Sequence, residues 1–357
     1  MTSAAGTTAV NERRNVSDAA GVAVLGSCAV WSLVTAAVHD GRPEGVLLAV
    51  LAMAAGYASG RILGAVAPVA APCAGALAGL GLALTARYTT PGPQVTVVLG
   101  HTGATAALLT LSVAAACCAA WAARPPALRL ALRLLAVGIT VTAAVLGSAA
   151  GCALGAAVLL CSLAADRVRR RALGLGVLTL AAALVTSTAW AIAEDALPDG
   201  LTASLEGQLT EHRVLLWRDA LHLAGRNPAL GVGPGRYGEL SPTIAQAPLP
   251  DGKPHSAALQ QVAEQGVVGA LLLAALFCWV LYSLWRSPRS TPIALTAGAA
   301  LTALAVIASV GNALSFTTVT AGAGLLAGLA TARPLADGCP DNAVKEDERL
   351  WAHRLEP

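Results

Sequence analysis

Long apolar blocks alternate with short polar connections along most of the chain. Most blocks approach the roughly 20 residues that an α-helix needs to cross a bilayer. We therefore predict an all-α polytopic membrane protein with about ten transmembrane helices. The expected spans are 19–38, 44–60, 62–85, 95–121, 128–146, 149–165, 172–193, 257–285, 293–311 and 316–332. They form one predicted domain, residues 19–332, between a tail of residues 1–18 and a tail of residues 333–357.

The composition excludes an ordinary soluble protein. Of the 357 residues, 56% are hydrophobic and 12% are charged. Soluble domains carry about 25% charged residues, so this chain has too few charges to cover a water-facing surface. The net charge of +3 gives no indication of nucleic-acid binding. The eight cysteines form no C-x-x-C pair, which argues against a zinc site or a disulfide framework, and we expect no metal and no cofactor.

Basic residues in the connections predict the orientation, because positive charge collects on the cytoplasmic side. With the N-terminus in the cytoplasm, the cluster Asp166–Arg171 and most other arginines also lie there. The basic residues then expected outside are Arg42, Arg87, Arg213, Arg218, Arg226, Arg236 and Lys253, a minority of the 23. We therefore expect both termini in the cytoplasm.

One polar segment interrupts the apolar pattern, from Glu194 to Ser256, and it is expected to face outward. It is far longer than the other external connections and contains seven prolines. Long loops in compact chains are usually functional or disordered. Its aromatic residues, helical pattern and basic residues favour a functional loop.

An amphipathic helix is predicted within this loop, from Leu205 to Ala224. Its apolar side holds Leu209, Leu216, Trp217, Ala220, Leu223 and Ala224, and its polar side holds Glu211, Arg218, Asp219 and His222. Arg213 lies on the apolar side, one turn before Trp217. It should either pair with a buried acid or face a cavity that receives an anion. Arg218 lies opposite, where a solvated charge is expected.

Two further stretches of the loop carry candidate chemistry. In Asn227–Gly238, four glycines within eight residues indicate a turn by themselves, but they also permit a nest of backbone N–H groups for an anion, and Arg236 adds a positive charge. No Lys-Ser/Thr pair follows, so it is not a P-loop. His255 stands where the chain re-enters the membrane and suits a general base, although a lone histidine is more often only an interfacial polar residue. Glu264 lies about two turns into the span, where a charge is costly, and Gln260 at i−4 is its expected partner.

The order of these motifs resembles the O-antigen ligase and polymerase superfamily, which comprises bacterial membrane glycosyltransferases of the GT-C type. The matching pieces are R-x-x-x-W-x-x-A from Arg213, N-P-x-x-G-V-G-x-G-x-Y from Asn227, and H-S-x-x-L-x-x-x-x-E-x-G-x-x-G from His255. Upstream, Gly100–Leu109 is similar to the family's N-x-x-A-x-x-L helix. The similarity covers roughly residues 95–284.

The resemblance implies a multi-pass protein of the bacterial inner membrane. It also implies transfer of a glycan from a polyprenyl diphosphate to a hydroxyl group of a glycan, lipid or protein acceptor, without a metal ion. Arg213 would hold the diphosphate and His255 would act as the base. Arg236, Trp217, Glu264 and Arg218 are the expected substrate-binding residues.

One departure from the family pattern keeps other functions open. Members commonly carry Ser-Arg-Gly at an external helix end, whereas this chain has Leu146–Gly151, without the arginine. Arg236, Arg87 and Arg42 are candidates to replace it. A non-catalytic assembly partner therefore stays possible. A transporter or flippase is the alternative from another class, but no internal repeat supports it.

Overall fold

The computed structural model describes residues 3–85, 94–168, 170–194, 211–245, 252–333 and 335, and gives the backbone alone for residues 3–16, 94–102 and 211. Within these ranges the regular structure is entirely helical. The helices are α1 Ser3–His39, α2 Glu44–Val66, α3 Ala70–Thr85, α4 Gln94–Ala122, α5 Pro126–Val145, α6 Ala149–Ala164, α7 Arg171–Ala193, α9 Glu211–Arg226, α10 Tyr237–Leu240, α11 Pro242–Ala245, α12 Ala257–Trp285, α13 Thr291–Ser309 and α14 Thr317–Thr331.

The chain is a multi-pass membrane protein, as predicted. Eight helices are long and apolar enough to cross a bilayer, and the shorter apolar helices α3 and α14 occupy the positions of two further predicted spans. One predicted boundary was wrong: Arg61 was expected in a connection after residue 60, but it lies inside α2, which continues to Val66. Asp18 neutralises Arg61 at 2.8 Å, so the arginine does not need to lie in a connection.

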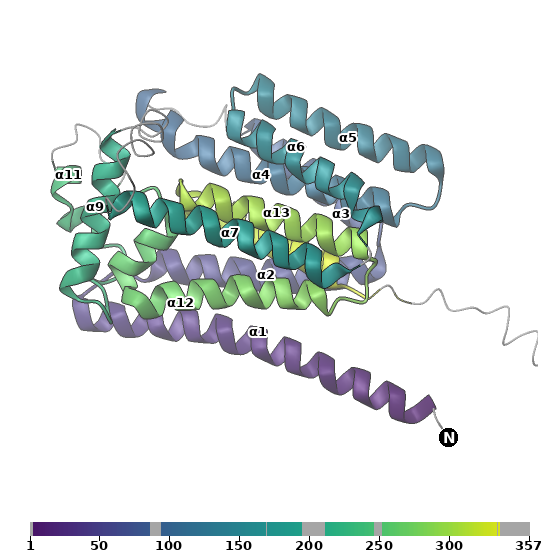
Figure 1. Ribbon diagram of the computed structural model, residues 1–357, viewed down its shortest axis with the longest axis horizontal. Helices are drawn as coiled ribbons and strands as arrows, with labels where there is room; N and C mark the ends of the chain where they lie inside the picture. Colours follow the sequence, from purple (N-terminus) through teal and green to yellow (C-terminus); the bar gives the residue numbers. More distant parts are fainter. Residues whose placement is uncertain are drawn as a thin grey trace, which may run out of the picture.

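The long helices lie side by side in one bundle, with α5 along one edge and α1 along the other (Figure 1). Helices α4 and α13 are the most deeply buried spans and form much of the core, which consists largely of alanine and leucine. The outer face of α5 exposes Leu130, Leu134, Val141 and Val145. An apolar outer surface fits contact with lipid acyl chains.

Helices α2 and α14 pack with their backbones in direct contact. A Cβ atom added at Gly60 would lie 2.3 Å from the carbonyl oxygen of Leu325, and one at Gly328 would lie 2.2 Å from that of Tyr57. Glycines spaced four residues apart on both helices allow this approach, which is a common way to join helices in a membrane.

The two ends of the bundle differ in character. Helices α9 and α11 cover one end, while α1 begins at the other (Figure 1). Asp18, Arg61, Arg286 and Arg333 surround a cavity at the end opposite α9. The described part of the polar excursion and these charged residues therefore lie at opposite ends, as the charge pattern predicts. Which end faces the cytoplasm stays a prediction.

Candidate functional site

Helix α9 closes one end of the bundle with its apolar side inward. Its buried side chains include Leu216, Trp217, Ala220 and Leu223, which join one apolar cluster with the end of α7 and the start of α12. This confirms the predicted faces of the helix; residues 205–210, where its start was expected, lie outside the described residues. Trp217 is fully buried, and its side chain packs α9 against the bundle.

Arg213 is half-buried on the inner part of α9, one turn before Trp217. Burial removes water from its guanidinium and lowers the pKa of Arg213 from its ordinary value. No acidic side chain within the described ranges pairs with it. Of the two roles predicted for Arg213, pairing with a buried acid is not seen among the described residues, and the binding of an anion stays a prediction. Arg218 is exposed, in agreement with its predicted solvated position.

Helix α12 breaks at Gly266, where φ is 69°, and the glycine-rich stretch of the loop fills the break. The backbone N–H of Val232 donates to the carbonyl of Ala263 at 2.9 Å, and that of Gly233 donates to the carbonyl of Glu264 at 2.9 Å. Helix carbonyls released by the interruption thus find partners in the loop, which a buried helix break requires.

Two further backbone groups at this break have partners in the loop and in α1. The N–H of Val267 donates to the carbonyl of Pro228 at 2.8 Å, and the indole of Trp31 in α1 donates to the carbonyl of Gln265 at 3.0 Å. A Cβ atom at Gly266 would lie 2.3 Å from the carbonyl oxygen of Ala229. Loop, α12 and α1 are therefore in close contact at one point.

The carboxylate of Glu264 occupies the backbone nest that the glycines were expected to offer to a substrate. It accepts hydrogen bonds from the N–H groups of Gly235 and Tyr237, and Lys253 contributes a nearby positive charge. The expected contact with Gln260 is confirmed, with Nε2 3.4 Å from the carboxylate. These two N–H groups therefore bind an acid of the protein itself, and Glu264 is only 4% exposed.

Arg236 joins the loop to the turn between α1 and α2. Its Nη1 donates to the carbonyl oxygen of His39 at 2.6 Å, and its Nε lies 3.8 Å from the carboxylate of Glu239. Arg42 shares the same carboxylate at 3.5 Å, and its N–H donates to the carbonyl of Pro234 at 2.7 Å. Arg236 and Arg42 thus surround one acid, between the α1–α2 turn and α10.

His255 lies just before α12, where it was predicted, and has an unusual backbone conformation. Its φ is 54°, in the left-handed region that side chains other than glycine seldom adopt. Such a conformation costs about 1–3 kcal/mol and is found most often at functional sites. The side chain is half-buried, and Ser256 beside it is buried at the N-cap of α12. Gly252 contacts Gly238, so this segment lies against α10.

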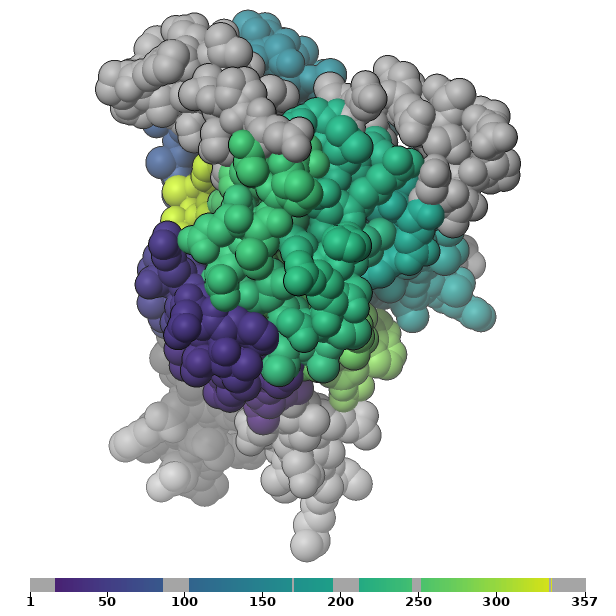
Figure 2. Space-filling model, turned by 90° about the vertical axis from the view of Figure 1, so that its left-hand side faces the viewer, coloured from purple at the N-terminus to yellow at the C-terminus, as the bar shows by residue number. Residues whose placement is uncertain are grey.

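Figure 2 shows that α9, α10, α11 and the start of α12 form most of this face, beside the α1–α2 turn in purple. The described contacts unite Arg236, Glu264 and Lys253 in one polar cluster through residues 233–239. Arg213 belongs to α9 and lies outside this set of contacts.

Sequence reasoning missed the role of Asp219, which was assigned to the solvated side of its helix. Its carboxylate accepts hydrogen bonds from the hydroxyl of Ser241 at 2.5 Å and from the N–H of Thr243 at 3.1 Å. Asp219 therefore binds the start of α11, where N–H groups are free. Ser241-Pro242-Thr243 has the composition of a helix start, but nothing in the sequence indicates that Asp219 is its partner.

At the place expected for Ser-Arg-Gly, Ser148 is the N-cap of α6 and accepts a hydrogen bond from the N–H of Gly151 at 3.2 Å. Gly151 packs closely on Ala106 of α4. Of the arginines proposed as replacements, Arg236 and Arg42 share an acid, and Arg87 lies outside the described residues.

Comparison with known proteins gives one match. A family model described as O-antigen ligase matches residues 95–274, about half of the chain, including α9 and the polar cluster. No curated protein and no solved structure matches.

Proposed function

The chain belongs to the O-antigen ligase family, and we propose that it transfers a glycan from a polyprenyl diphosphate to an acceptor hydroxyl outside the membrane. The observation that carries the proposal is Arg213, a half-buried positive charge that no acid pairs with among the described side chains. The matched region contains Arg213 and His255 together with the loop between them. The expected fold type within this proposal is GT-C, in a bacterial inner membrane with both termini in the cytoplasm.

Arg213 would bind the diphosphate of the donor. A guanidinium matches phosphate oxygens in a bidentate manner and stays charged when partly buried. As the bond between the sugar and the diphosphate breaks, negative charge develops on the leaving group. A fixed cation stabilises that charge, and loss of one such donor typically reduces kcat by about 10²–10³.

His255 would remove the proton from the acceptor hydroxyl. Its left-handed backbone conformation fixes where the side chain leaves the chain, just before α12. A positioned general base contributes about 10²–10⁴ to the rate. The reaction then forms a bond from the acceptor oxygen to the sugar and releases the polyprenyl diphosphate, with the proton on His255.

The other predicted substrate-binding residues divide into two groups. Trp217 and Glu264 are buried and would position the loop. Trp217 makes apolar contacts within the protein, and Glu264 makes polar ones. Arg236 and Arg218 are more exposed and would lie nearer to the glycan or the acceptor.

The test is the lipid-linked glycan pool in cells that carry Arg213→Gln or His255→Ala. Arg226→Gln is the matched control, because Arg226 is an exposed arginine at the end of the same helix. We expect polyprenyl-diphosphate glycan to accumulate and conjugate to disappear in the two site variants only. Normal conjugate in both site variants, at normal protein levels, refutes the assignment. A reporter inserted at Gly225 should be detected outside the membrane.

The same experiment separates the alternatives. In a transporter or flippase, discontinuous helices leave backbone groups for the cargo. The break of α12 at Gly266 has its neighbouring backbone groups engaged by Val232, Gly233, Pro228 and Trp31, which favours a transferase. A non-catalytic partner would tolerate both substitutions without accumulation of donor.

A further inference from the structure

A second polar site lies at the end of the bundle opposite α9. A cavity of about 450 Å³ opens there, where α1 begins its apolar stretch and α12 and α14 end. Ligand pockets commonly occupy about 300–1,000 Å³, so the volume suits a small group. The cavity lies away from α9, and binding of a ligand there does not require the proposed transfer reaction.

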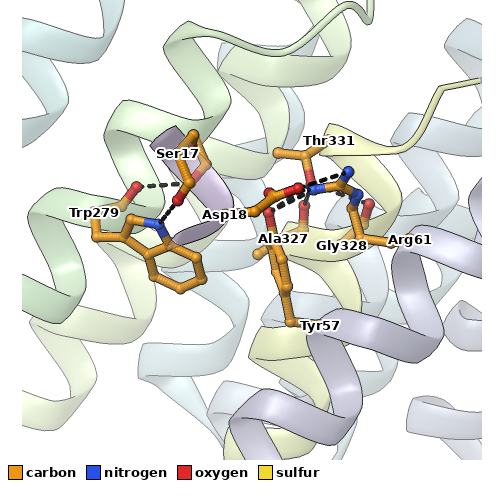
Figure 3. A network of polar contacts seen from close by, with 9 residues as sticks. Ser17, Asp18, Tyr57, Arg61, Trp279, Ala327, Gly328 and Thr331 are labelled. Carbon is orange, nitrogen blue, oxygen red and sulfur yellow. Dashed lines mark hydrogen bonds and ion pairs between the residues drawn. The ribbon is translucent and has the colours of Figure 1, made fainter. Parts of the chain in front are cut away.

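The walls of this cavity are held in place by contacts between distant helices (Figure 3). The indole of Trp279 in α12 donates to the carbonyl oxygen of Ser17 in α1 at 2.9 Å. The two oxygens of Asp18 accept from the guanidinium of Arg61 in α2 at 2.8 and 3.4 Å, and Tyr57 lies 3.2 Å from the same guanidinium. The site is therefore preformed.

Among the residues that the structure describes, the charges around the cavity do not balance. Three arginines line it, Arg61, Arg286 and Arg333, together with one acid, Asp18. Asp18 neutralises Arg61. Neither Arg286 nor Arg333 pairs with an acid in the described part of the chain, and Arg286 lies 5.6 Å over the ring of Trp285. Two arginines around one hollow repel each other unless an anion lies between them.

We propose that this cavity binds a phosphate group, supplied by the head group of an anionic lipid. Guanidinium groups match phosphate oxygens in a bidentate manner. Trp285 and Tyr57, which also line the cavity, are residues typical of the membrane–water boundary. The end opposite α9 is expected to face the cytoplasm, where the leaflet is anionic.

The test uses the purified full chain in a neutral detergent, with thermal unfolding followed as short-chain phosphatidylglycerol is added. Phosphatidylcholine of the same chain length and inorganic phosphate are added separately. We expect phosphatidylglycerol to raise Tm saturably. The double variant Arg286→Gln/Arg333→Gln should require at least about tenfold more of this lipid, since each basic residue near anionic lipid contributes to binding.

Arg167→Gln/Arg170→Gln is the matched control. It removes two exposed arginines from the connection between α6 and α7, at the same end but outside the cavity, and should bind as the native chain does. An equal loss in both double variants overturns the proposal, because it indicates diffuse charge rather than a site. Equal responses to phosphatidylcholine and phosphatidylglycerol also overturn it.

Inorganic phosphate distinguishes the source of the ligand. Saturation by phosphate alone, lost only in Arg286→Gln/Arg333→Gln, supports the phosphate site but assigns its ligand to a soluble anion. Asp18→Asn provides a test of the opposite sign, because it removes the only acid that lines the cavity among the described residues. A folded Asp18→Asn protein should bind phosphatidylglycerol more tightly, and weaker binding contradicts the inference.

Discussion

Replacing Gly266 with alanine should separate the glycine-rich stretch of the polar loop from α12. At φ 69° and ψ −169°, a region open essentially to glycine alone, an alanine is strained by about 1–3 kcal/mol relative to glycine. Its Cβ would lie 2.3 Å from the carbonyl oxygen of Ala229, whereas ordinary contact begins near 3.4 Å. The loop must therefore move by about 1 Å, a shift that weakens the hydrogen bonds from Val232, Gly233 and Val267.

Each of those three hydrogen bonds contributes about 0.5–1.5 kcal/mol. Together with the backbone strain, the loss of stability is expected to reach about 3–7 kcal/mol if all three bonds break. Thermal unfolding of the purified protein in detergent should show Tm lowered by about 5 °C or more. Transfer of glycan should fall further than Tm alone explains, because residues 233–239 also hold Glu264 and Arg236.

The control is Gly225→Ala, at the end of α9, where an added Cβ meets no atom within 4 Å. This variant should be neutral or slightly more stable, since alanine favours a helix over glycine. If Gly266→Ala matches Gly225→Ala in both Tm and activity, the loop does not dock into the break of α12, and the description of the site is wrong.

Three other substitutions test further parts of the fold. Gly328→Val should lower Tm strongly, because its Cβ would lie 2.2 Å from a backbone oxygen of α2, whereas Gly138→Ala on α5 meets nothing within 4 Å and should have little effect. Asp219→Ala should lower the free energy of unfolding by about 1 kcal/mol, because the hydrogen bonds to α11 are lost. Added protease should then cleave more readily near residue 243. Asp166→Ala, at an exposed position, should have neither effect. Glu264→Ala leaves two backbone N–H groups without their acceptor, which should lower the free energy of unfolding by about 1–3 kcal/mol for each group. The loss should be measured as a lower Tm, and it should be smaller in Glu264→Gln.

Local sequence patterns were sufficient to predict which segments form apolar helices and which side of α9 faces inward. Apolar blocks of bilayer length predict helices because a chain in lipid must satisfy its backbone hydrogen bonds internally. The inward side of α9 follows from a turn of 3.6 residues, which also placed Arg213 on the partly buried side. The histidine at the start of α12 was found from its position in the sequence, but its left-handed backbone was not.

The partners of charged groups depended on contacts between segments far apart in the chain. Arg61 was expected in a connection because an isolated charge avoids lipid, and Asp18 on another helix removes that restriction. The glycine-rich stretch was expected to form a turn or a nest of backbone N–H groups for an anion. The carboxyl group at this stretch is that of Glu264, and the two meet because the loop packs against the break in α12.

The sequence by itself determined which segments are apolar enough to cross a membrane, which side of α9 faces the bundle and which residue types are present at the loop, since these depend on composition and short-range periodicity. Tertiary structure decided which charges are neutralised within the protein and which stay available. Glu264, Arg42 and Arg236 have partners from other helices or loops, whereas Arg213 at one end and Arg286 at the other pair with no acid among the described residues. A charged side chain stays available to a ligand only where no opposite charge lies beside it. Whether one does depends on distances in space rather than along the chain.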